Sequence, residues 1–102
     1  MLQNIEPAAC EILRQYPVRR AALFGSAARR DMTERSDVDM VVEFLPGRGS
    51  VNLEYFGLHI DLEEALGRHV DLLTFDALET EAKPRFRERV LRDLRFIYER
   101  ES

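Results

Sequence analysis

Hydrophobic and polar residues change their spacing along the chain in a way that predicts helices alternating with short strands. Apolar side chains recur every three or four positions in residues 3–16, which is typical of an amphipathic helix, and Pro17 is expected to stop it. Short apolar runs bounded by turn residues predict strands at 21–24, 37–44 and 70–74. The run 37–44 is β-branched and apolar after its first three residues, so we expect it to be the central strand.

The remaining segments complete an alternating order of elements. Helices are predicted at 26–31 with Ser26 as N-cap, at 53–66 where Gly57 weakens the pattern, and from Pro84 to about residue 94. A brief helix or turn is predicted at 76–81, a loop at 47–50 and an edge strand at 96–98. Because helices alternate with strands, we expect one α/β domain over residues 1–102, with a small mixed sheet flanked by helices.

Composition narrows the class of protein without identifying its function. The 102 residues are 45% hydrophobic and 33% charged, which fits one globular domain and excludes a disordered tail. Fifteen basic and nineteen acidic residues give a formal net charge of −4, which argues against direct nucleic-acid binding but leaves room for a small nucleotide bound through a metal ion. The one cysteine, Cys10, excludes an internal disulfide bond and a multi-cysteine zinc site.

The sequence shows none of the segments that direct a protein to a membrane. Its apolar runs stay far below the ~20 residues needed to cross a bilayer. The first residues are acidic and polar where a secretory signal needs a basic start and an apolar stretch. We therefore expect a cytoplasmic protein that makes no membrane contact.

Gly25 and Ser26 stand where the strand at 21–24 gives way to a turn or helix. Glycine permits a positive φ or a close backbone approach, and the amides and hydroxyl around Ser26 can face an anion. Strand–Gly–Ser–helix junctions are also common structural turns, so the pair taken alone leaves both interpretations open.

Three carboxylates are candidate metal ligands. Asp37 and Asp39 flank Val38 at the start of a strand, so the strand period of two places both carboxylates on one face. Their mutual repulsion favours a bound cation, and hard oxygen ligands suit Mg²⁺, although a solvated strand end is the alternative. Asp71 lies in the apolar run 70–74, where an unpaired buried charge is costly. Either its strand adjoins that of Asp37 and Asp39 and all three share a metal, or Asp71 faces water at a sheet edge.

Taken together, these motifs resemble the nucleotidyltransferase superfamily related to DNA polymerase β, and in particular its minimal nucleotidyltransferases (MNT domains). The similarity runs through residues 22–29, 36–42 and 70–72 and extends to the chain length and the closing segment 83–99. It implies a single-domain polymerase β-like nucleotidyltransferase fold. Such proteins are often the antitoxin partners of HEPN-domain ribonuclease toxins in bacteria and archaea.

The resemblance also implies a role for each motif residue. Gly25 and Ser26 would hold the triphosphate of ATP or another NTP. The catalytic set would be Asp37, Asp39 and Asp71, which would also bind two Mg²⁺ ions that bridge the phosphates and support an in-line displacement. Asp71 would in addition help to deprotonate the acceptor hydroxyl.

Four basic or histidine side chains near these motifs have less definite roles. Arg29 would either pair with an aspartate and brace the site or contact a phosphate directly. Arg30 stands where such proteins usually carry glycine, and we expect it to change the shape of that loop or to add charge near the nucleotide. His59 and His69 have no second histidine or cysteine at ligand spacing, so we assign them surface or capping positions.

As a whole, the resemblance implies a Mg²⁺-dependent nucleotidyltransferase that is the antitoxin of a HEPN/MNT toxin–antitoxin pair. It would transfer AMP from ATP to a tyrosine of the HEPN toxin within a hetero-oligomer. One alternative is an antitoxin that neutralises the toxin by binding alone, with a non-catalytic nucleotide site. Another is a nucleotidyltransferase that modifies a small molecule or an RNA.

Overall fold

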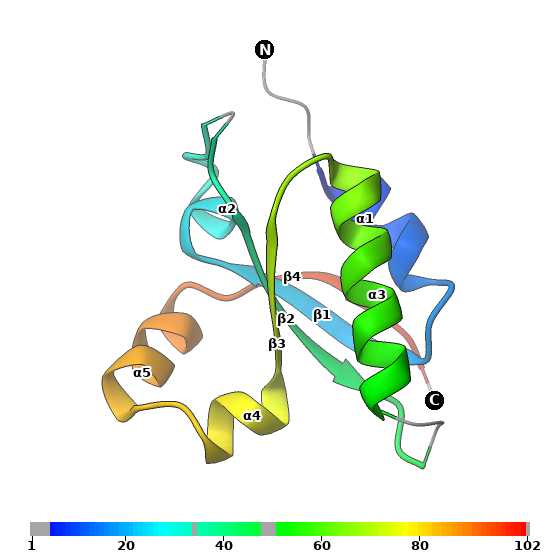
Figure 1. Ribbon diagram of the computed structural model, residues 1–102. Coiled ribbons are helices and arrows are strands. Elements are labelled where there is room, and N and C mark those ends of the chain that lie inside the picture. The colour runs from blue at the N-terminus through cyan, green and yellow to red at the C-terminus, as the bar shows by residue number, and fades with distance from the viewer. Residues whose placement is uncertain (1–4, 34, 48–50, 102) are drawn as a thin grey trace.

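The computed structural model describes residues 5–33, 35–47 and 51–101, which form one mixed four-stranded sheet with helices on both faces (Figure 1). The strand order is β3-β2-β1-β4, with β2 parallel to β3 and β1 antiparallel to both of its neighbours. In chain order the elements are α1 (Glu6–Leu13), β1 (Val18–Phe24), α2 (Gly25–Arg29), β2 (Val38–Phe44), α3 (Val51–Leu66), β3 (Val70–Thr74), α4 (Phe75–Thr80), α5 (Pro84–Arg92) and β4 (Arg95–Glu99).

The central strands bury side chains on both of their faces. On one face α1 and α3 pack against alternate residues that include Leu23 and Met40. On the other face α4 and α5 pack against the residues between them, such as Ala22 and Val41. Because adjacent residues of a strand point to opposite faces, a continuous apolar run supplies both layers. This confirms the predicted α/β fold with a small mixed sheet flanked by helices.

Several strand boundaries differ from the prediction, although β3 coincides with residues 70–74. β1 begins at Val18 rather than at 21, because Val18 and Arg20 also pair with β2, with an irregularity in the register between them. β2 begins at Val38, so Asp37 lies just before the strand. Both β1 and β2 are central, whereas 37–44 was expected to be central alone.

The helix boundaries differ in a similar way. α2 starts at Gly25 and ends at Arg29, and its N-cap position is Phe24, so the prediction of Ser26 as N-cap over 26–31 was wrong. α1 ends at Leu13 instead of continuing to 16, α3 starts two residues early, α4 starts and ends one residue early and α5 ends two residues early. The predicted loop at 47–50 lies outside the described residues except for Gly47.

Helix α3 runs through Gly57, which the sequence pattern had marked as a weak point. A Cβ at this position would lie 2.9 Å from the hydroxyl oxygen of Tyr16, which in turn donates a hydrogen bond of 2.5 Å to Asp61. The glycine therefore makes room for the contact between α3 and the segment after α1. The apolar residues of α3 occupy two faces: Leu58 and Leu62 are buried, whereas Leu53, Phe56 and Ile60 are exposed. Within the described residues, none of the helices has the length and hydrophobicity that crossing a bilayer requires.

Candidate active site

The three predicted carboxylates meet at one edge of the sheet, where β1 ends and β2 and β3 begin. β1 runs against β2 and β2 runs with β3, so these three strand ends lie side by side. In the ladders Phe24 faces Asp39, and Asp39 faces Asp71. Asp37 precedes β2 by one residue. The prediction that the strand of Asp71 neighbours the strand of Asp39 is therefore confirmed.

Exposure differs among the carboxylates, and Asp71 faces water at a sheet edge, which was one of the two alternatives that the sequence left open for it. The side chain of Asp71 is 54% exposed because β3 is an edge strand. Its neighbours Val70 and Leu72 are buried because they point to the opposite face. Asp37 is also exposed, while Asp39 is partly buried between them. The site thus has two solvent-exposed carboxylates, Asp37 and Asp71, and one recessed carboxylate, Asp39.

Among the three carboxylates, Asp39 is the one whose pKa is clearly shifted. Its pKa is raised from 3.8 to about 6, first by burial and then by the hydrogen bond with Asp71 and the negative charges of Asp71 and Asp37. The guanidinium of Arg29 acts in the opposite direction. Carboxylates that repel one another in this way are stabilised by a divalent cation, and hard oxygen donors suit such an ion. The donor set therefore fits a metal site held by Asp37, Asp39 and Asp71.

Gly25 lies against the recessed carboxylate. Its φ is +65°, and a Cβ placed on it would lie only 2.5 Å from Asp39 Oδ2. Any side chain here would force Asp39 to move, in addition to the strain of the left-handed backbone. Ser26 follows in the first turn of α2 and is partly buried. Both predicted nucleotide-binding residues are therefore next to the carboxylates in the fold.

Arg29 and Arg30 end α2 in different ways. Arg29 Nη1 lies 3.1 Å from Asp93 Oδ2 and its Nε lies 3.3 Å from Asp31 Oδ2, so it pairs with two aspartates outside the carboxylate set. Arg30 has φ +64° and ψ +27°, the left-handed conformation in which glycine is most easily accommodated. The substitution of the usual glycine by Arg30 therefore falls on the one described non-glycine residue with a positive φ.

Two open cavities flank Asp39 and share Phe24 and Phe86 as walls. The larger, of about 390 Å³, extends along β3 and α3 and includes Asp71 among its lining residues. The smaller, of about 200 Å³, extends toward α2 and α5 and is lined by residues that include Gly25 and Arg29. Phe24 and Phe86 contact each other edge to face, with ring centroids 6.2 Å apart. Asp39 thus faces space on both sides, one side bounded by the glycine turn and the other by Asp71.

Side chains of α3 hold the free edge of β3. Tyr55 donates a hydrogen bond from its hydroxyl to the carbonyl of Leu72, and His59 Nε2 lies 2.7 Å from the carbonyl oxygen of Val70. Glu63 Oε2 accepts a hydrogen bond of 2.9 Å from the backbone N–H of Val70, which lowers the pKa of Glu63. These three residues are spaced four apart, so they lie along one face of the helix. They fix β3, and with it Asp71, relative to α3.

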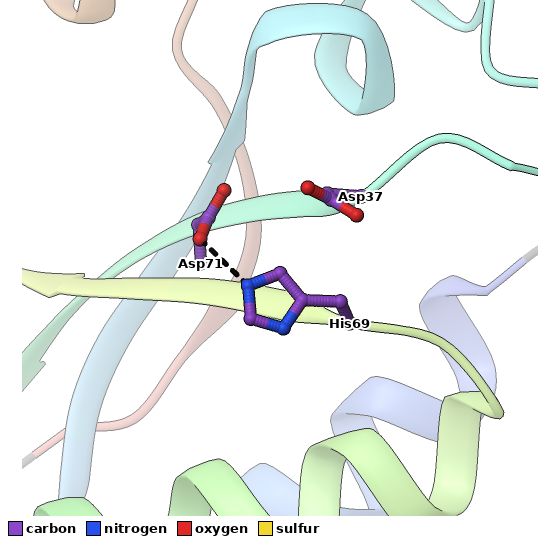
Figure 2. Close-up of side chains that lie close together, drawn as sticks. All are labelled: Asp37, His69 and Asp71. Atoms are coloured by element: carbon purple, nitrogen blue, oxygen red, sulfur yellow. Dashed lines mark hydrogen bonds and ion pairs between the residues drawn. The ribbon is translucent and has the colours of Figure 1, made fainter.

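His69 belongs to the carboxylate site, although the sequence analysis assigned it a surface or capping position. Its Nε2 lies 3.0 Å from Asp71 Oδ1 (Figure 2). Its Nδ1 lies 2.9 Å from Glu63 Oε2. The hydrogen bond to Asp71 raises the pKa of His69. The available signal was the spacing His-x-Asp at the start of a strand, which places both side chains on one face. The partners of His69 are carboxylates, so a spacing typical of histidine or cysteine ligands does not reveal them.

Arg95 is a second residue that the sequence analysis missed. Its Nε and Nη2 donate hydrogen bonds of 3.1 Å to the carbonyls of Ala28 and Ala27, and its Nη1 pairs with Glu6. One guanidinium at the start of β4 therefore ties α2 to α1. Because Gly25 and Ser26 begin α2, Arg95 sets the position of the glycine turn without touching the carboxylates.

Comparison with known proteins agrees with this geometry. Residues 9–102 match the family described as polymerase beta, nucleotidyltransferase. A Methanocaldococcus jannaschii protein whose name assigns it provisionally as a protein adenylyltransferase is 37% identical over 92 residues, which are 90% of this chain and 92% of that protein. A solved structure described provisionally as a minimal nucleotidyltransferase is 34% identical, with a TM-score of 0.67 over 88% of this chain and 86% of the other.

A more distant structure shares the fold alone. It is described as a tri-AMPylated Shewanella oneidensis HEPN toxin in complex with an MNT antitoxin, and it matches at 22% identity with a TM-score of 0.65. The match covers 98% of this chain and 74% of the other. The family match over most of the chain, together with relatives above 30% identity over nearly their full lengths, shows that this chain belongs to the polymerase β-type nucleotidyltransferase family, among its minimal nucleotidyltransferases.

Proposed function

We propose that this protein is the antitoxin of a HEPN/MNT toxin–antitoxin pair and transfers AMP from ATP to a tyrosine of its HEPN partner in a Mg²⁺-dependent reaction. The observation that carries the proposal is the register of Asp39 opposite Asp71, with Asp37 beside them and Gly25 against Asp39. These groups bring metal-binding carboxylates and a backbone turn suited to phosphates into one open site.

The carboxylates have distinct positions for this chemistry. Asp37, Asp39 and Asp71 would hold Mg²⁺, which supplies charge neutralisation for the triphosphate and for the departing pyrophosphate. Asp39 is recessed against Gly25, so it suits the phosphate side of the site. Asp71 is exposed and faces the larger cavity, so it suits the side from which an acceptor hydroxyl arrives.

In the proposed transfer, one bond to the α-phosphorus forms as another breaks. The tyrosine hydroxyl oxygen forms a bond to the α-phosphorus of ATP, and the bond from that phosphorus to the oxygen bridging to the β-phosphate breaks. The hydroxyl proton passes to the Asp71 carboxylate, and pyrophosphate leaves. Gly25 and Ser26 would hold the triphosphate in line. Arg29 would brace the turn, because it is already paired with Asp31 and Asp93, and it remains within electrostatic range of Asp39.

The partner and the acceptor are supported by the relatives. The fold is shared with a chain from a complex that contains an AMPylated HEPN toxin and its MNT antitoxin, and a relative at 37% identity carries the name of a protein adenylyltransferase. The two cavities beside Asp39 are open, so an acceptor as large as a protein side chain can reach Asp71. Localisation in the cytoplasm is part of the same proposal, since ATP and a toxic ribonuclease are both found there.

The test is transfer of label to a HEPN-domain protein, which the proposal expects to be encoded next to this one. The purified pair is incubated with Mg²⁺ and ATP labelled at the α-phosphate, or in a parallel reaction at the γ-phosphate. We expect label on the HEPN protein only from α-labelled ATP, mapped to tyrosine by mass spectrometry. Asp37→Asn combined with Asp39→Asn should abolish transfer, whereas Asp76→Asn, an exposed carboxylate in α4 away from the site, should leave it unchanged.

The same experiment separates the alternatives. Transfer that survives in the double variant would show that these carboxylates are not catalytic. If the wild type transfers no label but still forms a stoichiometric complex that neutralises the ribonuclease, the protein acts by binding alone. Label found on RNA or on a small molecule in place of the HEPN protein would assign a different acceptor.

A further inference from the structure

We propose that His69 is a nitrogen ligand of the metal site, held in place by Glu63, and that it gives the site formed with Asp37 and Asp71 a preference for first-row divalent transition ions such as Mn²⁺ over Mg²⁺. The inference rests on the proposed metal-binding role of these aspartates. It adds a donor of a different chemical class to the three carboxylates.

The first support is the position of the imidazole. One ligand atom each from Asp37, His69 and Asp71 lie within 4.8 Å of one another, a separation that a single ion can bridge (Figure 2). His69 Nε2 is 3.0 Å from Asp71 Oδ1. A divalent ion can replace the proton of this hydrogen bond and bind both atoms. All three side chains are exposed, so an ion can enter from solvent.

The second support is the residue behind the imidazole. His69 Nδ1 lies 2.9 Å from Glu63 Oε2, and the same oxygen accepts the N–H of Val70 at 2.9 Å. The carboxylate is thus fixed by the backbone of β3 and accepts a hydrogen bond from Nδ1–H, which leaves the Nε2 lone pair for the cluster. A histidine that binds a metal commonly donates its other N–H to a carboxylate in this way.

The third step concerns the identity of the ion. Mg²⁺ is a hard cation that prefers oxygen donors and water, whereas imidazole suits first-row transition ions. A site of two carboxylates and one imidazole therefore discriminates between these ions more than a site of carboxylates alone. Removing the imidazole should lower the affinity for Mn²⁺ by roughly tenfold or more, while the affinity for Mg²⁺ changes less.

The test is direct detection of nitrogen at bound Mn²⁺. Mn²⁺ is added to the full-length protein, and electron spin-echo envelope modulation reports whether an imidazole ¹⁴N is coupled to the ion. We expect ¹⁴N modulation in the wild type, its loss in His69→Gln and its retention in His59→Gln. His59 is a matched control because its Nε2 also lies 3.3 Å from Glu63 Oε2. It does not belong to the cluster of Asp37, His69 and Asp71.

The affinities of the same variants for Mn²⁺ and Mg²⁺, measured by titration calorimetry, provide a second readout. Circular dichroism establishes that each variant is folded. Absence of ¹⁴N modulation in the wild type, or its persistence in His69→Gln, would overturn the inference and leave AMP transfer by the carboxylates untouched. Conversely, ¹⁴N modulation without transfer of label to the HEPN protein would sustain the nitrogen ligand and reject the proposed reaction.

Discussion

The carboxylate of Asp39 occupies the space that a side chain at position 25 would need. A Cβ on Gly25 would lie 2.5 Å from Asp39 Oδ2 and 3.7 Å from Asp39 Cβ. The glycine at the end of β1 therefore has two reasons to be there: its positive φ and the close approach of a carboxylate from β2. Position 25 influences the metal site through Asp39 as well as through any contact with phosphate.

Substitution of this glycine should separate backbone strain from damage to the site. Gly25→Ala and Gly67→Ala both place a side chain at a φ near +65°, and each should lower the free energy of unfolding by about 1 kcal/mol. Only Gly25→Ala meets Asp39, whereas the space around Gly67 is open. We expect a loss of AMP transfer and of Mg²⁺ binding of at least about tenfold in Gly25→Ala alone. Urea unfolding and calorimetry measure the two effects, and equal activity of the two variants would contradict the prediction.

The raised pKa of Asp39 predicts a pH dependence of stability in metal-free protein. Because its pKa is about 6 in the folded chain and 3.8 as a free group, the folded state binds the proton more tightly. The resulting stabilisation is fully present below pH 3.8 and is lost as the pH rises through about 6. Asp39→Asn removes this contribution, so the difference in melting temperature between variant and wild type should favour the variant most above pH 6 and shrink toward pH 4.

Addition of Mg²⁺ at pH 7 supplies the control for that experiment. The ion should raise the melting temperature of the wild type, because it offsets the repulsion among the carboxylates, and should raise that of Asp39→Asn less. A constant difference between the two proteins from pH 4 to pH 8 would show that Asp39 titrates normally.

Replacement of Arg30 by glycine should stabilise the folded protein. It is held at φ +64°, which is unfavourable for a side chain and ordinary for glycine. Arg30→Gly should therefore raise the free energy of unfolding by about 0.5–1 kcal/mol, after allowing for the greater flexibility of glycine in the unfolded chain. Arg35→Gly, an exposed arginine without a positive φ, should be neutral or destabilising. Chemical denaturation of the two variants checks the difference, and stabilisation by both would point to removal of charge.

Arg95 should affect activity without touching substrate. Arg95→Lys keeps the charge but loses the planar fork that reaches Ala27, Ala28 and Glu6, so the free energy of unfolding should fall by about 1–3 kcal/mol. Displacement of α2 should also lower the rate of AMP transfer. Arg92→Lys, at an exposed position at the end of α5, should change stability by no more than about 0.5 kcal/mol. Identical behaviour of the two variants in denaturation and transfer assays would contradict the proposed role of Arg95.

Local periodicity accounts for what could be predicted from the sequence. The period of two around Asp37 and Asp39, and the apolar run that contains Asp71, were enough to expect strands. A carboxylate site shared by all three residues was one of two alternatives there, and the family resemblance favoured it. The pairing of β2 with β3 places Asp39 opposite Asp71, so the carboxylates lie close together. The exposure of Asp71 was left open because it depends on the position of β3 at the sheet edge, which follows from topology and not from the run itself.

Contacts between distant segments account for what was missed. Arg95 finds its three partners 67, 68 and 89 residues earlier, and two of them are backbone carbonyls, which leave no mark in the sequence. The role of His69 depends on Glu63 from α3 as much as on Asp71 from its own strand. The apolar residues of α3 followed a helical spacing, but their division into buried and exposed faces depends on which side of α3 meets the sheet.

The row of Tyr55, His59 and Glu63 along β3 has a consequence for assembly. These side chains already occupy the backbone groups of Val70 and Leu72 that an incoming strand would need. A strand of a second chain cannot pair with β3 without first displacing these side chains. This edge of the sheet is therefore protected against edge-to-edge aggregation. A partner that binds near Asp71 must therefore be recognised through contacts other than strand pairing with β3.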